Sequence, residues 1–336
     1  MSQPKVLIAR GVFEQVVQRL SQHFEVQANP DDTIYSKAEL IQHLQGKAGA
    51  FTTGSERIDA EVLAACPQLR VVANMAVGYN NFDIPACTAR GVLATNTPDV
   101  LTETTADFGF ALMMAAARRM AESEHFLRRG EWSKWAYDMF TGSDVHGATL
   151  GILGMGRIGQ AIARRGALGF GMRVIYHNRS RLPAEEEAPI GARYVDKATL
   201  LREADHLVLV LPYSPASHHA IGAAELAQMK PTATLTNVAR GGIVDDAALA
   251  AALREHRIAA AALDVFEGEP SVHPALLTVP NVVLTPHIAS ATVATRRAMA
   301  DLAADNLIAA LTGAPPPTPI NPEVLEGGVL RQSAGA

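Results

Sequence analysis

Short apolar runs alternate with amphipathic segments over the first hundred residues. Apolar runs typical of buried strands occupy residues 5–9, 49–53, 69–74 and 92–96. Between them, apolar residues recur at helical spacing in 12–20, 37–44 and 59–65. Strands that alternate with short helices form a parallel sheet covered by helices on both faces. We therefore expect this part of the chain to form one small α/β unit.

A second series of strand patterns begins near residue 148. Apolar runs lie at 148–153, 172–177, 206–211, 233–238, 259–265 and 281–285, with helical patterns at 226–229 and 246–255. Two longer Ala-rich segments, 102–120 and 291–311, are predicted to be long helices. The prolines that follow residue 314 end the second of these, and the tail beyond them is expected to be loose.

Two polar or aromatic stretches do not fit the strand-helix alternation. Residues 130–142 are rich in aromatic side chains and predicted to be loop-like. This segment is either a surface loop packed on its own domain or an arm that brings Trp135 to a second subunit. The run Glu185, Glu186 and Glu187 is interpreted as the solvated face of a helix.

Composition excludes several classes of protein. A length of 336 residues suggests about two domains, and 48% hydrophobic residues allow a sizeable core. The net charge is −5 with no basic stripe, so we expect no nucleic-acid partner. We see neither a signal peptide nor an apolar run that spans a bilayer, so we expect no membrane and a cytoplasmic location. Cys66 and Cys87 lie outside any C-x-x-C pattern, and we expect free thiols and no metal.

A glycine-rich turn follows the apolar run at residue 148. Gly154, Gly156 and Gly159 have G-x-G-x-x-G spacing between a predicted strand and a predicted helix. In such a turn the first glycine permits a tight bend and the second lets the backbone approach a pyrophosphate. The third lets the helix pack closely on the strand. The helix N-terminus adds free N–H donors, so this context predicts a dinucleotide site.

Several further blocks resemble the D-2-hydroxyacid dehydrogenase family, and most closely its glyoxylate/hydroxypyruvate/2-ketogluconate reductase branch. The blocks are NMAVGYNNFD at 74–83, TPDVLTETTAD at 97–107, NVARGG at 237–242, ALDVFEGEP at 262–270 and TPHIAS at 285–290. The resemblance implies two Rossmann-like parallel-sheet α/β domains joined by two long helices. Residues 1–101 and 289–336 would form a flavodoxin-like substrate domain, and 102–288 the NAD(P)-binding Rossmann domain. The active site would lie in the cleft between the two lobes.

Three residues have the chemistry that reduction of a 2-oxo acid requires. The planar guanidinium of Arg240 can bind the substrate carboxylate and polarise the adjacent carbonyl. His287 can donate the proton, because an imidazole titrates near neutrality. The resemblance pairs Glu269 with His287, and a carboxylate there favours the protonated ring.

The resemblance also implies binding residues. The backbone N–H groups of Val77 and Gly78 would bind the substrate carboxylate, and Leu101 and Trp135 would flank the substrate. Asp264 would hold the nicotinamide amide. The other residues expected to contact the cofactor are Thr105, Arg157, Ile158, Leu211, Pro212, Ser217, Val238, Ala239 and Ala289, together with Arg240 and His287.

The end of the second nucleotide-domain strand indicates which cofactor is preferred. NAD-binding units place Asp or Glu there to bind the ribose 2′-hydroxyl. This chain has Asn178 instead, followed by Arg179 and Ser180, which can donate to a 2′-phosphate. We therefore predict NADPH in preference to NADH. Alternatively, Arg179 stacks on adenine or faces solvent.

Other functions remain open at this stage. Some relatives of the family are nicotinamide-sensing co-repressors that keep the catalytic residues. Phosphoglycerate dehydrogenase is another alternative, although Asn178 and the short chain after the second long helix disfavour it. Formate or phosphite oxidation fits the sequence blocks less well. The favoured interpretation is a reductase of glyoxylate, hydroxypyruvate or 2-ketogluconate, and relatives imply a homodimer.

Overall fold

The computed structural model describes residues 3–326 and divides the chain into two compact units. One unit contains the chain up to Leu101 and the segment from Thr292 onward; the other is Thr102–Ala291. The chain thus leaves the first unit once and returns to it once. The chain re-enters the first unit at Thr292, three residues later than the sequence predicts.

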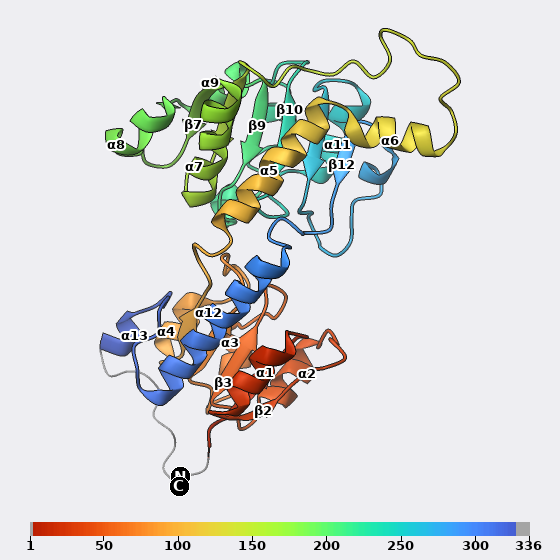
Figure 1. The fold of residues 1–336 in the computed structure, drawn as a ribbon. Helices are drawn as coiled ribbons and strands as arrows, with labels where there is room; N and C mark the ends of the chain where they lie inside the picture. The colour runs from red at the N-terminus through yellow and green to blue at the C-terminus, as the bar shows by residue number, and fades with distance from the viewer. Residues whose placement is uncertain (1–2, 327–336) are drawn as a thin grey trace. The chain divides into compact units, whose positions relative to one another are not determined.

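The first unit, coloured red to orange and blue in Figure 1, is a five-stranded parallel sheet in the order β2-β1-β3-β4-β5. This is the doubly wound order of flavodoxin-like folds. Its strands are β1 (Lys5–Ile8), β2 (Glu25–Gln27), β3 (Gly49–Thr52), β4 (Val71–Asn74) and β5 (Leu93–Thr95). Its helices are α1 (Glu14–Ser21), α2 (Lys37–Leu44), α3 (Ala60–Ala65), α4 (Ile84–Ala89), α12 (Val293–Thr312) and α13 (Glu323–Glu326).

Side chains alternate between the two faces of this sheet. Val6 and Ile8 of β1 lie in a core with α1 and α12, whereas Leu7 lies in a separate core with α2 and α3. Polar caps start several of the short helices: Ser36 forms a capping box with Glu39 at the start of α2. The prediction of a loose tail is wrong for residues 318–326, and its remainder, 327–336, lies outside the described residues. The buried amide of Asn321 bonds the backbone of β5 and its approach, and Val324 is buried.

The second unit is a seven-stranded parallel sheet in the order β12-β11-β10-β9-β6-β7-β8. The strand order reverses between β6 and β9, which is where ligands bind in doubly wound sheets. The strands are β6 (Thr149–Leu153), β7 (Arg173–His177), β8 (Arg193–Tyr194), β9 (His206–Leu209), β10 (Thr234–Asn237), β11 (Ala260–Leu263) and β12 (Val282–Leu284).

Helices cover both faces of this sheet. They are α5 (Thr102–Ala117), α6 (Met120–Arg128), α7 (Arg157–Arg164), α8 (Ala184–Glu187), α9 (Lys197–Glu203), α10 (Ala223–Leu226) and α11 (Asp246–Arg254). A π-helical turn at Arg165–Gly169 extends α7, and 3-10 turns lie at Ala188–Ile190, Pro215–Ser217 and Leu276–Thr278. The core under α5 and α7 includes Phe110 and Leu150, and the core of the other face includes Leu200, Leu207 and Leu249.

The long helix predicted at 102–120 is present as α5 and ends at Ala117, three residues before the predicted end. Arg119 has the left-handed backbone conformation, with φ of 52°, and separates α5 from α6. Its guanidinium bonds Glu122 and lies over the ring of Phe140. These contacts turn the chain out of the direction of α5.

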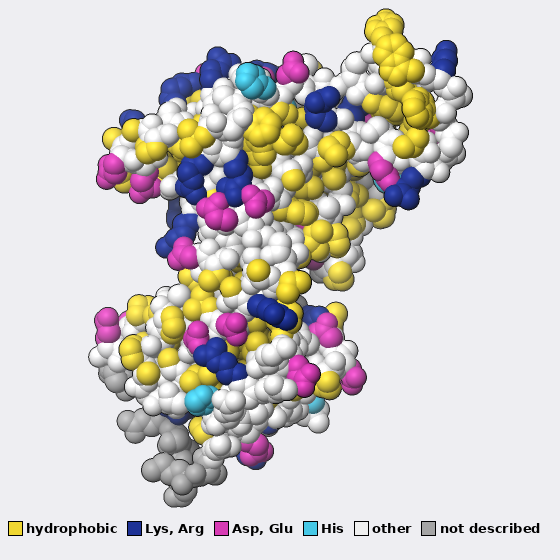
Figure 2. Space-filling model, viewed as in Figure 1, with side chains coloured by type: hydrophobic (Ala, Val, Ile, Leu, Met, Phe, Trp, Pro, Cys, Tyr) yellow, Lys and Arg dark blue, Asp and Glu magenta, His cyan; other side chains and the backbone are white. Residues whose placement is uncertain are grey.

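The aromatic segment after α6 contains no helix or strand in the structure. At its base, Phe140 packs against Phe126 at a ring-centroid distance of 5.1 Å. Farther out, Trp132, Trp135 and Tyr137 are 55%, 76% and 84% exposed. Figure 2 shows hydrophobic side chains gathered on this projecting segment. The outer part of the segment is therefore not packed on its own domain.

No helix among residues 3–326 combines the length and the apolar character that crossing a bilayer requires.

Candidate active site

The glycine loop follows β6 at the reversal of strand order in the second unit. Gly154 has φ of +104°, and a Cβ at this position would lie 2.7 Å from the backbone nitrogen of Leu211. Only glycine therefore fits between β6 and the end of β9. Gly156 is the N-cap of α7; no side chain caps this helix, and a Cβ at Gly156 would meet nothing within 4 Å. The start of α7 therefore has no side-chain cap and has open space beside Gly156, which suits the pyrophosphate of a dinucleotide.

Asn178 joins this loop to the end of β7. Its Oδ1 accepts a hydrogen bond of 2.7 Å from the backbone N–H of Met155, between the first two glycines of the motif. Tyr194 of β8 donates to the backbone carbonyl of Asn178 at 3.1 Å. The residue that replaces the usual carboxylate therefore shapes the glycine loop. Arg179 and Ser180 follow it and are exposed, and the guanidinium of Arg179 bonds none of the described residues.

A buried brace fixes the other end of this segment. Glu187 accepts hydrogen bonds from the Tyr176 hydroxyl at 2.6 Å and from Arg181 at 2.6 and 2.9 Å. The Tyr176 oxygen also accepts a bond from the backbone N–H of Leu182. Bonds from Arg181 and Tyr176 lower the pKa of Glu187 to about 2, whereas burial and Glu187 raise the pKa of Tyr176 to about 12. Arg181 is thus bonded to Glu187, whereas the exposed Arg179 is available to bind a ligand.

This brace corrects the interpretation of the acidic run as a solvated face. Glu185 and Glu186 are exposed, but Glu187 is 6% exposed and points inward to Tyr176. Sequence reasoning missed the brace because nothing in the run distinguishes its third glutamate from the others.

Arg240 lies in the turn after β10. Asn237, the last residue of this strand, holds the turn: its amide donates to the Arg240 carbonyl and accepts from the Ala239 N–H. The guanidinium of Arg240 donates to the Ala239 carbonyl at 2.6 Å and is half-buried. Burial lowers the pKa of Arg240, and the nearby charge of Glu269 opposes that shift. An arginine so placed stays charged and can bind a small anion.

The turns after β10 and β11 are in direct contact. A Cβ at Gly241 would lie 1.7 Å from the carbonyl oxygen of Phe266, so only glycine allows this approach. The two strands are paired in register, with Asn237 opposite Leu263. Arg240 is thereby held next to the loop that carries Glu269.

Glu269 and His287 form the pair that the family resemblance implied. Nδ1 of His287 lies 2.8 Å from Oε2 of Glu269, and the other carboxylate oxygen accepts from the Phe266 N–H. Burial raises the pKa of Glu269, but the bond and charge of His287, the Phe266 N–H and the charge of Arg240 outweigh it and lower the pKa. Nε2 of His287 bonds none of the described residues and is the nitrogen available to a ligand.

Asp264 positions the loop of His287. Its buried carboxylate accepts three bonds of 2.7–2.8 Å, from the Thr285 hydroxyl and the N–H groups of Ile288 and Ala289. Its carbonyl also accepts from the N–H of His287, which has φ of +53°. Sequence reasoning assigned Asp264 to the nicotinamide, which stays a prediction, and missed this structural role.

The first unit contains three of the predicted substrate contacts, Val77, Gly78 and Leu101. In the loop after β4, the carbonyl of Val77 accepts from Asn96 at 2.8 Å and that of Gly78 accepts from Asn74 at 3.0 Å. The N–H groups of these two residues donate to no acceptor among the described residues. Leu101 is buried at the end of the unit.

The structure places the other predicted residues on the second unit. Ser217 stabilises the loop after β9 by bonding Ser214 and Pro212. Trp135 lies on the exposed segment, away from buried contacts. Thr105, Ser217, Val238, Ala239 and Ala289 are buried, Ile158 and Leu211 are half-buried, and Arg157 and Pro212 are exposed.

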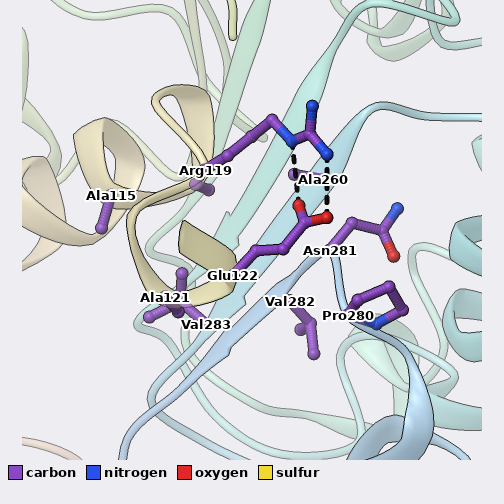
Figure 3. Close-up of a pocket in the computed structure, with 10 residues that line it drawn as sticks. Ala115, Arg119, Ala121, Glu122, Ala260, Pro280, Asn281, Val282 and Val283 are labelled. Carbon is purple, nitrogen blue, oxygen red and sulfur yellow. Dashed lines mark hydrogen bonds and ion pairs between the residues drawn. The ribbon is translucent and has the colours of Figure 1, made fainter. Parts of the chain in front are cut away.

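Two hollows lie at the opposite, amino-terminal edge of the same sheet. One, of about 10 Å³, lies beside Ala260 and Asn281, where the bonded pair Arg119 and Glu122 closes it (Figure 3). Its volume suits a single water molecule. The other, of about 310 Å³, is an open depression lined by residues that include Asp144, His146 and Asp205. Neither hollow contains a predicted site residue. The charged residues Arg240, Glu269 and His287 lie at the carboxyl edge of the sheet, so we place the candidate active site there.

The fold and these loops together define a doubly wound, dinucleotide-binding α/β enzyme. The glycine turn follows β6, and Arg240, Glu269 and His287 follow β10, β11 and β12 at the same edge of one parallel sheet. Ligands of such sheets bind at this edge.

Comparisons with known proteins identify the family. Residues 110–289 match the family described as D-isomer specific 2-hydroxyacid dehydrogenase, NAD binding domain. A glyoxylate reductase of Thermococcus onnurineus is 51% identical over 326 residues, which cover 96% of this chain and 97% of that protein. The chain belongs to the D-isomer specific 2-hydroxyacid dehydrogenase family, and it is an oxidoreductase that uses a nicotinamide cofactor.

Solved structures support the same assignment over the whole chain. A crystal structure of a protein from Thermus thermophilus matches with a TM-score of 0.86 and 41% identity, covering 94% of this chain and 99% of that one. An NADPH-dependent glyoxylate/hydroxypyruvate reductase of Sinorhizobium meliloti, in complex with NADP and malonate, matches with a TM-score of 0.84 and 37% identity. That match covers 95% of this chain and 97% of that one. The predicted family and fold class are therefore confirmed.

Proposed function

We propose that the protein is an NADPH-preferring reductase of small 2-oxo acids, with glyoxylate, hydroxypyruvate and 2-ketogluconate as substrates. The observation that carries this proposal is the pairing of Glu269 with His287 beside the turn of Arg240, at the carboxyl edge of the dinucleotide-binding sheet. The relatives support the substrate class, because the similar protein of Thermococcus onnurineus is a glyoxylate reductase.

The residues of the second unit fit a nicotinamide dinucleotide. The uncapped N-terminus of α7 and the open side of Gly156 suit its pyrophosphate. When bound, this group supplies the hydride that reduces the carbonyl carbon. The exposed Arg179 beside neutral Asn178 suits a 2′-phosphate, which supports NADPH over NADH.

Arg240 and His287 divide the remaining work on the substrate. The guanidinium binds the carboxylate and polarises the carbonyl, so that negative charge on its oxygen is stabilised. Nε2–H of His287 donates the proton to that oxygen as the carbon accepts hydride, and the product is the D-2-hydroxy acid. Glu269 orients the ring through Nδ1 and stabilises its charged form.

Initial rates test this function directly. Oxidation of NADPH and of NADH is followed at saturating glyoxylate, hydroxypyruvate, 2-ketogluconate and pyruvate. We expect turnover with the hydrophilic acids and a higher kcat/KM for NADPH. Equal or better use of NADH would overturn the cofactor preference. Tight NADPH binding without turnover of any acid would instead favour a nicotinamide-sensing protein.

We also propose that the protein is a homodimer in which the exposed aromatic segment contacts the partner. Trp135 and Tyr137 are among the most exposed large side chains of the described residues, and aromatic side chains are enriched at protein interfaces. Light scattering of the wild type and of the double variant Trp135→Ser, Tyr137→Ser tests this. A monomeric wild type would overturn it.

A further inference from the structure

A cluster of two imidazoles and one carboxylate lies beside the site but outside the proposed chemistry. His218, His219 and Glu267 each offer a ligand atom, and these atoms all lie within 4.8 Å of one another. Nε2 of His219 is 2.9 Å from Oε2 of Glu267. The two rings stack with centroids 3.9 Å apart at 21°. The nitrogens of stacked rings do not point at a common atom, so binding of one ion requires one ring to rotate. His218 is exposed and has room for this rotation.

Polar groups lie near Nδ1 of both rings. Nδ1 of His218 lies 3.2 Å from the hydroxyl of Tyr213, within hydrogen-bond distance. Nδ1 of His219 lies 3.9 Å from Oδ2 of Asp245, the residue that caps α11, which is beyond hydrogen-bond distance. Metal-binding histidines commonly bond a polar group through the nitrogen that does not bind the metal. The Tyr213 hydroxyl is such a group for His218, and Asp245 adds negative charge near His219.

We propose that His218, His219 and Glu267 form a binding site for a divalent transition metal, with Zn²⁺ as the best fit. Two imidazoles and one carboxylate suit Zn²⁺, whereas Ca²⁺ and Mg²⁺ prefer oxygen ligands alone. Three protein ligands leave one position for water, as expected for an exposed site. On binding, the ion replaces the direct contact between His219 and Glu267.

The position of this site gives it a consequence for the enzyme. The histidines belong to the loop after β9, and Glu267 belongs to the loop after β11 that also carries Glu269. A metal ion would connect these two loops at their tips. We expect the connection to restrain the loop of Glu269, so that Zn²⁺ reduces turnover without competing with the substrate.

Calorimetry with Zn²⁺ alone tests the site without reference to activity. The full-length protein is freed of metal with a chelator and titrated with ZnCl₂ in a buffer that does not bind metal. We expect one saturable site per chain, weakened about tenfold or more by His218→Gln and by His219→Gln. His256→Gln, which removes an exposed histidine elsewhere on the same unit, is the matched control and should leave the affinity unchanged.

The outcomes separate this site from the proposed reaction. Equal affinity in wild type and both variants, with their unfolding temperatures unchanged, would overturn the site, as would the absence of saturable binding. Titration with Mg²⁺ should give no heat of binding, and a response like that to Zn²⁺ would also contradict the assignment. Inhibition of NADPH oxidation by Zn²⁺ should be lost in His218→Gln, whose activity without metal should equal that of the wild type.

Discussion

The two sheets of this protein have the same doubly wound construction but different chemistry in the loops after their strands. In the first unit, the charged residues after β1 and β2, Arg10 and Asp32, bond each other. The loop after β4 is held by neutral amides, because Asn96 and Asn74 donate to the carbonyls of Val77 and Gly78. In the second, charged side chains follow three adjacent strands, including Arg240 and the pair of Glu269 with His287. The shared fold places the loops after the strands together at one edge of each sheet. The residue types in these loops determine which ligands that edge can bind.

The largest effect is expected when the guanidinium of Arg240 is removed from the second unit. Arg240→Ala should lower kcat/KM for glyoxylate by about 10³-fold, because the variant loses both the carboxylate clamp and the polarisation of the carbonyl. Steady-state kinetics with NADPH measure this, and Arg254→Ala, an exposed arginine of α11, is the control. A rate near that of the wild type would contradict the role of Arg240 and would leave the loop after β4 in the first unit as the group that binds the substrate carboxylate.

The next test separates the acid pair by pH. Burial opposes ionisation of Glu269, but the bond and charge of His287 outweigh it and lower the pKa of this carboxyl below its ordinary value of 4.5, so it is ionised at neutral pH. Glu269→Gln removes this charge and should reduce the reductive rate by about 10²-fold at neutral pH. The difference between wild type and variant should shrink as the pH falls below 4.5, where the wild-type carboxyl is protonated as well. A variant with the wild-type rate at neutral pH would show that Glu269 only packs beside the ring.

A smaller effect concerns the cofactor side of the same edge. Arg179→Ala should raise the KM for NADPH about tenfold and leave the KM for NADH unchanged, because the variant loses a charge-assisted bond to a phosphate that NADH lacks. Parallel titrations with both cofactors measure the split. Equal changes for both would indicate stacking on adenine in place of phosphate binding.

The brace beneath that segment gives a prediction for stability. Glu187→Gln should lower the unfolding temperature by a few degrees at neutral pH, whereas Glu185→Gln, on the exposed side of the same helix, should not. Because the folded-state pKa of Glu187 is about 2, below the ordinary value of 4.5, its contribution is present above pH 4.5 and is lost as the pH falls toward 2. The difference between wild type and variant should shrink over that range in thermal melts. A difference independent of pH would mean that the charge does not matter.

The smallest expected effect on substrate kinetics comes from a change in the loop after β4 of the first unit. Asn96→Ala removes one hydrogen bond to the Val77 carbonyl, and the KM for glyoxylate should rise about threefold with little change in kcat. A change in kcat as large as that of Glu269→Gln would contradict the division of roles between the two edges.

Much of this organisation could be predicted from the sequence. Strand and helix patterns indicated two parallel-sheet units, and motif spacing located the glycine turn, because these features depend on residues near one another in the chain. The acid pair came from a family resemblance, since no local pattern relates Glu269 to His287. The structure then showed the pair at 2.8 Å.

What the sequence could not show depends on contacts between distant residues. The break at Arg119 results from its bond to Glu122 and its contact with Phe140, thus on where the aromatic segment returns. The inward turn of Glu187 requires Tyr176, eleven positions earlier on another element. The role of Asp264 in holding residues 285–289 depends on the pairing of β11 with β12. In each case the local conformation depends on a polar contact with a residue of another segment. The pattern of hydrophobic residues does not predict such contacts.

The placement of α12 in the first unit also affects how the protein is made. The strands of that unit are all translated before Leu101, together with α1, but α12, the other helix that covers Val6 and Ile8, follows the whole of the inserted unit. A nascent chain therefore carries a sheet face that only α1 covers while the ribosome completes residues 102–291. The inserted unit holds all its own strands and can finish folding first. The early segment must meanwhile stay soluble, and this interval is where chaperone dependence and aggregation should concentrate.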